Sequence, residues 1–126
     1  AIGNFIQQAR TEKEIIVQGD GAPVRSYLYM ADLVAWLLTL LVKSSPNQIY
    51  NVGSDQAISI GDLAHLVRDV VSPEKPVRVL SRPSYSIGNA IRNYYVPDIT
   101  RARNDFGLDV WTPLAEAIRR TSVACT

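Results

Sequence analysis

The sequence predicts one small mixed α/β domain, with short strands and about five helices. Segments with apolar residues at helical spacing alternate with short apolar runs, and glycine, proline, serine or asparagine bounds each of these runs. The chain has 126 residues and no internal repeat, which suits a single domain. The lack of a long set of strands argues against a complete doubly wound domain.

The first half of the chain is expected to hold two helices and three short strands. Apolar residues at helical spacing predict an amphipathic helix at 2–9. Strands are expected at 14–18, 26–29 and 48–52, with a glycine turn at 19–23. Asp32 suits the positive end of a helix that runs to about Lys43. This helix is apolar almost all round, so we expect it to be buried on most sides, against something larger than the sheet of these 126 residues.

The second half is expected to hold three helices. Ser59 and Asp62 have the spacing of a capping box before an apolar helix that ends at Ser72-Pro73. A strand is expected at 76–80, and a short extended piece at 94–96. Between them, 81–93 is a long loop, and such loops are more often functional or mobile. The last two helices are expected from Asp98 as a cap to Gly107, and from Thr112-Pro113 onward.

Composition and charge exclude several classes of protein. Hydrophobic residues make up 47% of the chain and charged residues 20%, as in a packed soluble domain. A net charge of +1 gives no broad basis for binding nucleic acid or a membrane surface, so we expect neither partner. The longest apolar run, 33–42, is far short of the roughly 20 residues that span a bilayer. No signal peptide is visible, and Cys125 as a free thiol indicates the cytoplasm.

Most catalytic motifs are absent from the sequence. Gly19 and Gly21 have the first spacing of a dinucleotide fingerprint, but Val24 stands at the third glycine position and no helix begins there. No P-loop occurs, and one histidine with one cysteine does not make a metal site. His65 is expected at the surface of its helix.

Arginines in loops are the best candidates for binding. Arg25 follows the glycine turn, and Arg82 and Arg92 lie in the long loop. A guanidinium can hold a phosphate or carboxylate through its planar fork of donors. The alternative for each is a surface ion pair within a purely structural domain. Arg101, Arg103, Arg119 and Arg120 fall on expected helices and are interpreted as solvated.

Several blocks, taken together, resemble the NAD-dependent nucleotide-sugar epimerases and dehydratases, extended members of the short-chain dehydrogenase/reductase superfamily. Residues 15–33, IIVQGDGAPVRSYLYMADL, have the family's strand, Gly-x-Gly turn, arginine, aromatic pair and aspartate opening an apolar helix. The later blocks IYNVGS at 49–54, ISI at 58–60, YVPD at 95–98 and TPL at 112–114 follow in the family's order. The resemblance covers essentially the whole chain.

The resemblance implies that the chain is the C-terminal, substrate-binding part of such an enzyme. By resemblance, Arg25 contacts the diphosphate of the nucleotide-sugar, with Arg92 or Arg82 as the second arginine. Gln18 and Gly19 match a strand end along the nucleotide. Ser59 and Ile60 match a stretch near the base or ribose.

The departures from the family concern catalysis. The glycine fingerprint for NAD is absent, and so is the catalytic Tyr-x-x-x-Lys pair, because Ala31 and Leu33 stand four residues after Tyr27 and Tyr29. The resemblance therefore implies a missing N-terminal Rossmann domain that carries NAD(P) and the catalysis, in a full-length enzyme that is a homodimer. The alternative is a free-standing nucleotide-sugar-binding or protein-interaction domain without catalysis.

Overall fold

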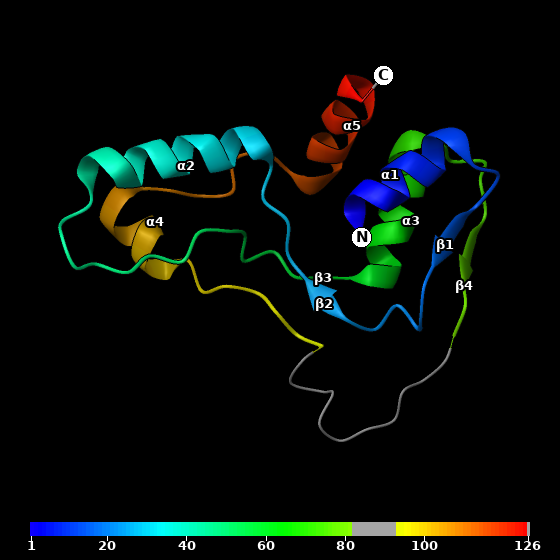
Figure 1. The fold of residues 1–126 in the computed structure, drawn as a ribbon, viewed down its shortest axis with the longest axis horizontal. Coiled ribbons are helices and arrows are strands. Elements are labelled where there is room, and N and C mark those ends of the chain that lie inside the picture. The colour runs from blue at the N-terminus through cyan, green and yellow to red at the C-terminus, as the bar shows by residue number, and fades with distance from the viewer. Residues whose placement is uncertain (82–92, 126) are drawn as a thin grey trace.

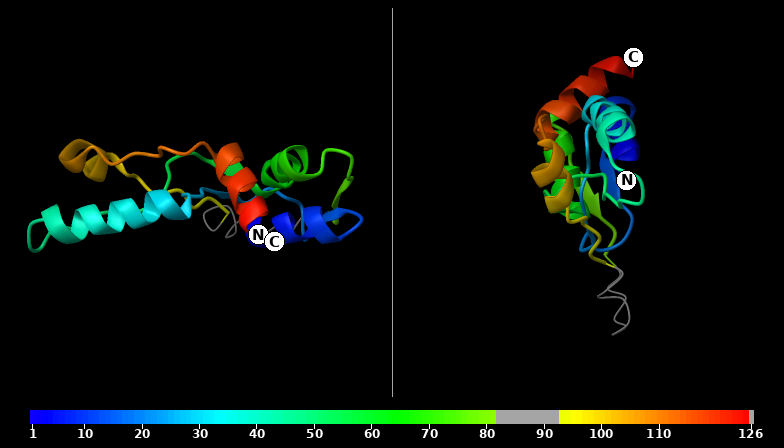
Figure 2. Two further views of the ribbon diagram at one scale, coloured as in Figure 1. Left: turned by 90° about the horizontal axis from the view of Figure 1, so that it is seen from above. Right: turned by 90° about the vertical axis from the view of Figure 1, so that its left-hand side faces the viewer.

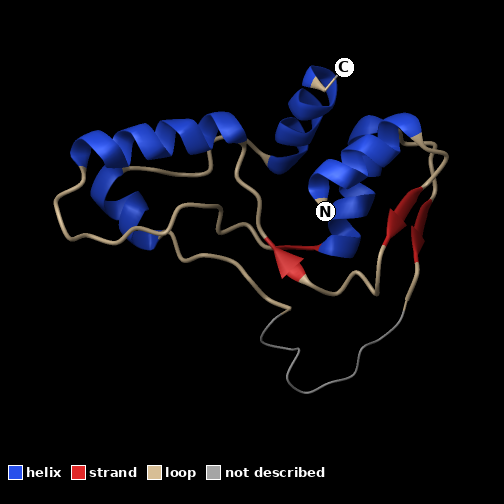
Figure 3. Ribbon diagram, viewed as in Figure 1, coloured by secondary structure: helices blue, strands red, loops and turns tan. Residues whose placement is uncertain are grey.

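In the computed structural model, residues 1–81 and 93–125 are described, and they form five helices and four short strands (Figure 1). Most of the chain outside the helices runs as loop (Figure 3). The elements are α1 (Ile2–Thr11), β1 (Ile15–Val17), β2 (Val24–Arg25), α2 (Met30–Lys43), β3 (Ile58–Ser59), α3 (Ile60–Val71), β4 (Val77–Val79), α4 (Thr100–Phe106) and α5 (Leu114–Ala124).

The main lobe consists of α1, α3 and α5 with a two-stranded parallel sheet. Strand β1 pairs with β4, with Ile15 opposite Val77 and Val17 opposite Val79. The three helices pack together beside this sheet (Figure 1). They bury one apolar cluster, which consists of Phe5, Ile6, Ala9, Ile15, Val17, Leu63, Ala64, Val67 and Ile118. This lobe therefore has a core of its own.

The arm, residues 30–57 and 96–111, extends away from the main lobe (Figures 1 and 2). It holds α2 and α4, and its buried cluster is Trp36, Ile99, Ala102 and Leu108. Trp36 is fully buried, and its indole Nε1 donates a hydrogen bond to the carbonyl oxygen of Asp109 at 2.9 Å. The arm is held together around this one large side chain.

A second, antiparallel pair of strands lies between the main lobe and the arm. Val24 of β2 is opposite Ser59 of β3, and Arg25 is opposite Ile58. Tyr94 adds a parallel bridge to Val24. Three distant parts of the chain therefore meet at this point, just before α3 begins.

Many predicted elements are confirmed. Helices form at 2–11, 60–71, 100–106 and 114–124, strands form within 14–18 and 76–80, and Tyr94 forms the expected extended bridge. Ser59 caps α3, because its Oγ accepts a hydrogen bond from the Asp62 amide at 3.0 Å. Gly107 ends α4 with φ +65°, a left-handed conformation that glycine adopts without strain. His65 is exposed, as expected.

Two predicted strands are wrong. The strand expected at 26–29 forms instead at Val24–Arg25, because those residues face β3 and the residues after them have no strand opposite. The strand expected at 48–52 does not form. In the described part of the chain, no other strand lies beside this segment to accept or donate ladder hydrogen bonds.

Asp32 lies at the start of α2 as expected, whereas the expected cap of α5 is wrong. The N-cap of α2 is Tyr29, and Asp32 lies in the first turn, 7% exposed. Its carboxylate accepts hydrogen bonds from the Thr112 amide at 2.9 Å and the Thr112 hydroxyl at 3.0 Å. Pro113, and not Thr112, is the N-cap of α5. Asp32 at the start of α2 and Thr112 before α5 thus bind each other, although they are 80 residues apart in sequence.

Within the described residues α2 is mostly exposed, so its expected burial against something larger than the sheet of these 126 residues stays a prediction. Only Asp32 and Trp36 of this helix are buried, and Leu41 is 80% exposed. Among the described helices, none has the length and apolar character needed to cross a membrane.

Candidate functional site

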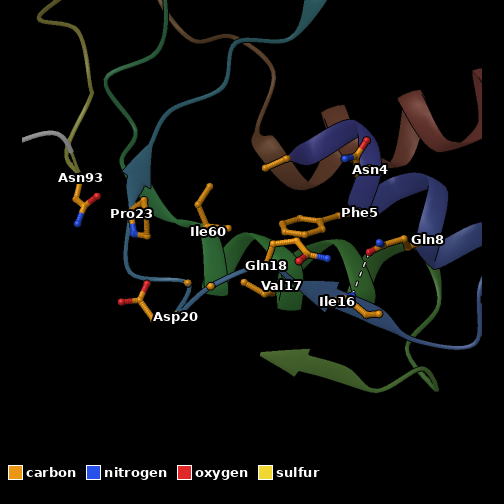
Figure 4. Close-up of a pocket in the computed structure, with 13 residues that line it drawn as sticks. Asn4, Phe5, Gln8, Ile16, Val17, Gln18, Asp20, Pro23, Ile60 and Asn93 are labelled. Atoms are coloured by element: carbon orange, nitrogen blue, oxygen red, sulfur yellow. Dashed lines mark hydrogen bonds between the residues drawn. The ribbon is translucent and has the colours of Figure 1, made fainter. Parts of the chain in front are cut away.

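A cavity of about 510 Å³ lies between α1 and the glycine turn that follows β1 (Figure 4). Helix α1 contributes Asn4, Phe5 and Gln8 to its lining. The end of β1 and the turn contribute residues 16–21 and Pro23. Ala1, Ile60 at the start of α3, and Asn93 complete its described lining.

The glycine turn gives this cavity its shape. Gly19 has φ +117° and Gly21 has φ +74°, and L-side chains rarely adopt such angles. A Cβ on Gly21 would lie 3.0 Å from the Cα of Gly61, so the turn approaches α3 at a distance that only glycine permits. The side chain of Asp20 braces the turn by accepting a hydrogen bond from the Ala22 amide at 2.9 Å.

The turn also caps α3. The amide of Gly61 donates to the carbonyl of Gly21 at 3.0 Å, and the amide of Ile60 donates to the carbonyl of Pro23 at 2.8 Å. With the Ser59 cap, the first amide groups of α3 are satisfied within the chain. The cavity is therefore lined by side chains and turn backbone, and not by an open helix terminus.

The lining combines one aromatic ring with several uncharged amides. The ring of Phe5 lies beside Gln18, and Asn4 and Asn93 stand at the rim (Figure 4). The Gln8 Oε1 accepts a hydrogen bond from the Ile16 amide at 3.1 Å, which fixes that side chain. Amides offer both donors and acceptors, and a ring offers a flat apolar face. This set suits a planar, uncharged ligand group with polar edges, such as a nucleobase.

Arg25 lies at the Asn93 end of the cavity. Its Nη1 donates to the carbonyl of Val24 at 2.7 Å and to the carbonyl of Asn93 at 3.0 Å, and Asn93 also lines the cavity. Burial raises the pKa of the nearby Tyr27 phenol, and the positive charge of Arg25 partly offsets that rise. The guanidinium is thus a cation held beside the cavity, whose described lining also includes Asp20.

The structure brings together some of the predicted site residues. Gln18, Gly19 and Ile60 line the cavity, and Arg25 reaches its rim through Asn93. Ser59 caps α3 and is not among the described lining residues. Arg82 and Arg92 lie outside the described residues.

Sequence reasoning named only Gln18, Gly19 and Ile60 of the described lining, and the residues that it missed include Asn4, Phe5 and Asn93. Phe5 belongs to the apolar stripe of α1, and its spacing indicated only core packing. Asn93 is distant in sequence from every other lining residue. No sequence signal separates such positions from ordinary helix and loop residues, because the shared cavity arises only when the chain folds.

The arginines on helices form ion pairs at the surface. Arg119 and Arg120 both donate hydrogen bonds to the carboxylate of Glu116. These bonds lower the pKa of Glu116 from 4.5 to about 2, and the bond from Arg119 has the larger effect. Arg103 bridges Asp55 at 3.0 Å and Asp109 at 2.8 Å. Arg101 donates to the carbonyl of Ile49 at 3.0 Å. These contacts fit the expectation of solvated helix faces.

The described residues do not fit a dinucleotide site. The Gly19-x-Gly21 turn connects two strands, β1 and β2, whereas a dinucleotide fingerprint connects a strand to a helix. No group of three or more His, Cys, Asp or Glu side chains within 1–81 and 93–125 is placed to hold a metal ion.

Comparison with known proteins gives consistent results. The family model "NAD dependent epimerase/dehydratase family" matches residues 1–53. UDP-glucuronic acid decarboxylase 1 of Xenopus tropicalis is 29% identical over 120 residues, which cover 95% of this chain and 27% of the relative. The dTDP-D-glucose 4,6-dehydratase of Mus musculus is 36% identical over 63 residues, or 50% of this chain and 18% of the relative. The chain therefore spans about a quarter or less of these relatives.

Solved structures share the fold. UDP-glucose 4-epimerase from Thermotoga maritima, solved with UDP-glucose, superposes with a TM-score of 0.79 at 22% identity, over 97% of this chain and 38% of that one. An epimerase from Methanothermobacter thermautotrophicus superposes with a TM-score of 0.79 at 20% identity. The match covers 97% of this chain and 35% of that one.

Proposed function

We propose that this chain belongs to the NAD dependent epimerase/dehydratase family, whose model matches residues 1–53, and that it is the nucleotide-sugar-binding part of a longer enzyme. The relatives are named for UDP-glucuronic acid and dTDP-glucose, and one solved neighbour holds UDP-glucose. All three molecules are sugars linked to a nucleoside diphosphate. The chain aligns with only 27% of the decarboxylase, which leaves room for a catalytic domain elsewhere in a longer polypeptide.

The observation that carries this proposal is the cavity beside Arg25. A nucleotide-sugar needs a partly apolar pocket for its base and a cation for its diphosphate. The ring of Phe5 and the amides of Asn4 and Gln18 suit the first requirement. Arg25, held by the carbonyls of Val24 and Asn93, suits the second.

In the proposed complex, the nucleoside lies along the end of β1, against Gln18 and Gly19, with Ser59 and Ile60 on the α3 side near the base or ribose. The diphosphate lies toward Arg25, and Arg92 or Arg82 supplies a second guanidinium. Side chains that hydrogen bonds already hold in place lose little conformational entropy when the ligand binds. This preorganisation contributes to affinity.

The chemistry belongs to the N-terminal domain that we propose for the longer enzyme. That domain carries the Tyr-x-x-x-Lys pair and the NAD(P) that supplies hydride transfer. The residues of this chain bind and orient the sugar nucleotide, so that the reacting carbon stays near the catalytic groups. The chain thus contributes to the rate by positioning the substrate.

The proposal is tested by Arg25→Ala in the longer enzyme. We expect substrate binding to weaken by about 1.5–3 kcal/mol, because a charge-assisted contact to the diphosphate is lost. Isothermal calorimetry with UDP-glucose, UDP-glucuronic acid and dTDP-glucose measures it. Arg78→Ala is the matched control, because Arg78 pairs with Glu14 on the exposed surface and does not line the cavity. Equal affinities for the two variants would contradict the role of Arg25.

The same titrations separate the two functional hypotheses. A chain of 126 residues that binds these ligands as tightly as the longer enzyme would favour the free-standing binding domain. Weak binding by the short chain and tight binding by the longer enzyme support a cleft shared with another domain.

A further inference from the structure

A second cavity, of about 520 Å³, adjoins the candidate site along the seam between α1 and β1. Helix α1 contributes Asn4, Gln7 and Gln8 to its lining, and the loop that leads to β1 contributes residues 12–14. The lining also includes Ile16. Asn4, Gln8 and Ile16 line the first cavity as well, so the two cavities meet at these three residues.

A hydrogen bond between β1 and Gln8 lies where the two cavities meet. Strand β1 bonds to the β4 side of its sheet through the Ile15 amide at 3.0 Å and the Val17 carbonyl at 3.1 Å. The backbone of Ile16 therefore faces the opposite edge, where β1 has no strand partner among the described residues. At that edge the Ile16 amide donates to Gln8 Oε1 at 3.1 Å (Figure 4).

This hydrogen bond turns the side chain of Gln8 into a wall between the cavities. The side chain is half-buried, and it is anchored at one end by the backbone of α1 and at the other end by the Ile16 amide. A ligand that pushed it aside would break the hydrogen bond and leave the Ile16 amide without its acceptor, which costs free energy. The first cavity therefore has a defined end on this side.

We propose that Gln8 is a specificity-determining residue that limits the base of the sugar nucleotide to a single ring. This inference rests on the proposed function, which sets the diphosphate near Arg25 and Asn93. Asn93 and the bond between Gln8 and Ile16 lie at opposite ends of the cavity lining (Figure 4). The base, as the end of the nucleotide farthest from the diphosphate, then points toward Gln8. A pyrimidine stops short of this wall, whereas the second ring of a purine meets it.

The second cavity determines what happens when the wall is removed. A side chain deleted from a closed core leaves a void, but behind Gln8 there is already space of about 520 Å³. That space is lined by polar groups, among them the amide of Gln7 and the ammonium of Lys13, which can bind the polar edge of a base. Truncation of Gln8 should therefore lengthen the base pocket, so that a purine fits.

Titration calorimetry of the longer enzyme with UDP-glucose and GDP-glucose tests the proposal, because the two ligands differ only in the base. We expect UDP-glucose to bind at least about tenfold more tightly, the discrimination that a pocket of limited size provides. Gln8→Ala should reduce this ratio at least about tenfold, because GDP-glucose gains affinity once its second ring can enter the second cavity.

Two further variants separate the wall from other roles of the helix. Gln8→Glu keeps the length of the side chain and an acceptor for the Ile16 amide, so it should keep the preference for UDP-glucose. Gln7→Ala is the matched control, because Gln7 lines the second cavity and not the first, and it should leave the ratio unchanged. Hydrogen exchange needs no ligand: the Ile16 amide should exchange faster in Gln8→Ala than in Gln8→Glu.

The possible failures are distinguishable. Equal affinities of the unaltered enzyme for UDP-glucose and GDP-glucose would overturn the proposal and leave the proposed function intact. A Gln8→Ala variant with an unchanged ratio, or with both affinities lowered equally, would overturn it too, because Gln8 would then not limit the size of the base. If neither ligand binds the unaltered enzyme, the proposed function is wrong, and this inference is wrong with it.

Discussion

The main lobe and the arm both contain helices with apolar faces but bury these faces to different extents. In the main lobe, three helices and β1 contribute to one cluster, and the apolar stripes of α1 and α3 face each other. In the arm, the buried cluster consists of Trp36, Ile99, Ala102 and Leu108, and most of α2 is exposed. The difference teaches that an apolar pattern specifies a face that needs a partner, and not where that partner lies.

The comparison also separates two kinds of stability. The core of the main lobe draws on segments at both ends of the chain, so it should unfold as one cooperative unit. The arm has the smaller buried cluster, centred on Trp36, and we expect it to open first. The proposed binding cavity lies in the main lobe, lined by α1, the glycine turn and the start of α3.

The largest loss of folding stability is expected from Trp36→Ala. Removing a fully buried tryptophan should cost about 3–5 kcal/mol, because a cavity remains and the Asp109 carbonyl loses its donor. Hydrogen exchange should show faster exchange in α2 and α4, with α1 and α3 unchanged. Leu63→Ala, in the core of the main lobe, is the matched control and should speed exchange in α1, α3 and α5. Loss of protection in both lobes from Trp36→Ala would contradict the division into two units.

The next largest loss of stability is expected where the arm meets α5. Asp32→Ala should destabilise the protein by about 1–3 kcal/mol, since the Thr112 amide would be left without its acceptor. Thermal unfolding measures this loss. Thr112→Val removes only the hydroxyl contact and should cost less. A larger loss for Thr112→Val than for Asp32→Ala would contradict the dominant role of the amide bond.

A smaller loss of stability is expected at Gly21, in the glycine turn that lines the cavity. Gly21→Ala should cost about 1–2 kcal/mol for the left-handed backbone alone, and the contact of its Cβ with Gly61 adds to that cost. Gly3→Ala in α1 is the control, because a Cβ there meets no atom within 4 Å. We expect the control to be neutral or stabilising. Thermal unfolding of the two variants checks the prediction, and equal midpoints would contradict it.

The smallest effect concerns acid stability. The hydrogen bonds from Arg119 and Arg120 lower the folded pKa of Glu116 to about 2, below its ordinary value of 4.5. The stabilisation is therefore fully present above pH 4.5 and is lost as the pH falls through about 2. Glu116→Gln should flatten the decline in stability over this window, measured by denaturant unfolding at several pH values. An unchanged slope would contradict the ion pair.

Local sequence signals predicted most helices and several details of their ends. Ser59 caps α3 and Gly107 ends α4 because these effects act within one turn of helix. The same signals failed at 26–29 and 48–52, because a strand forms only where another strand lies beside it. Of the candidate site, Gln18, Gly19 and Ile60 were predicted by resemblance and do line the cavity. Their role in binding stays a prediction.

The sequence by itself determined the glycine turn and two helix ends, Ser59 before α3 and Gly107 after α4, since each depends on residues close together in the chain. Only the tertiary structure decided that Asn93 joins Arg25 to the cavity, that Asp32 holds Thr112, and that α2 exposes one of its two apolar faces. The physical reason is that these contacts join residues far apart in sequence, and the pattern around each residue contains no information about which distant residue will meet it.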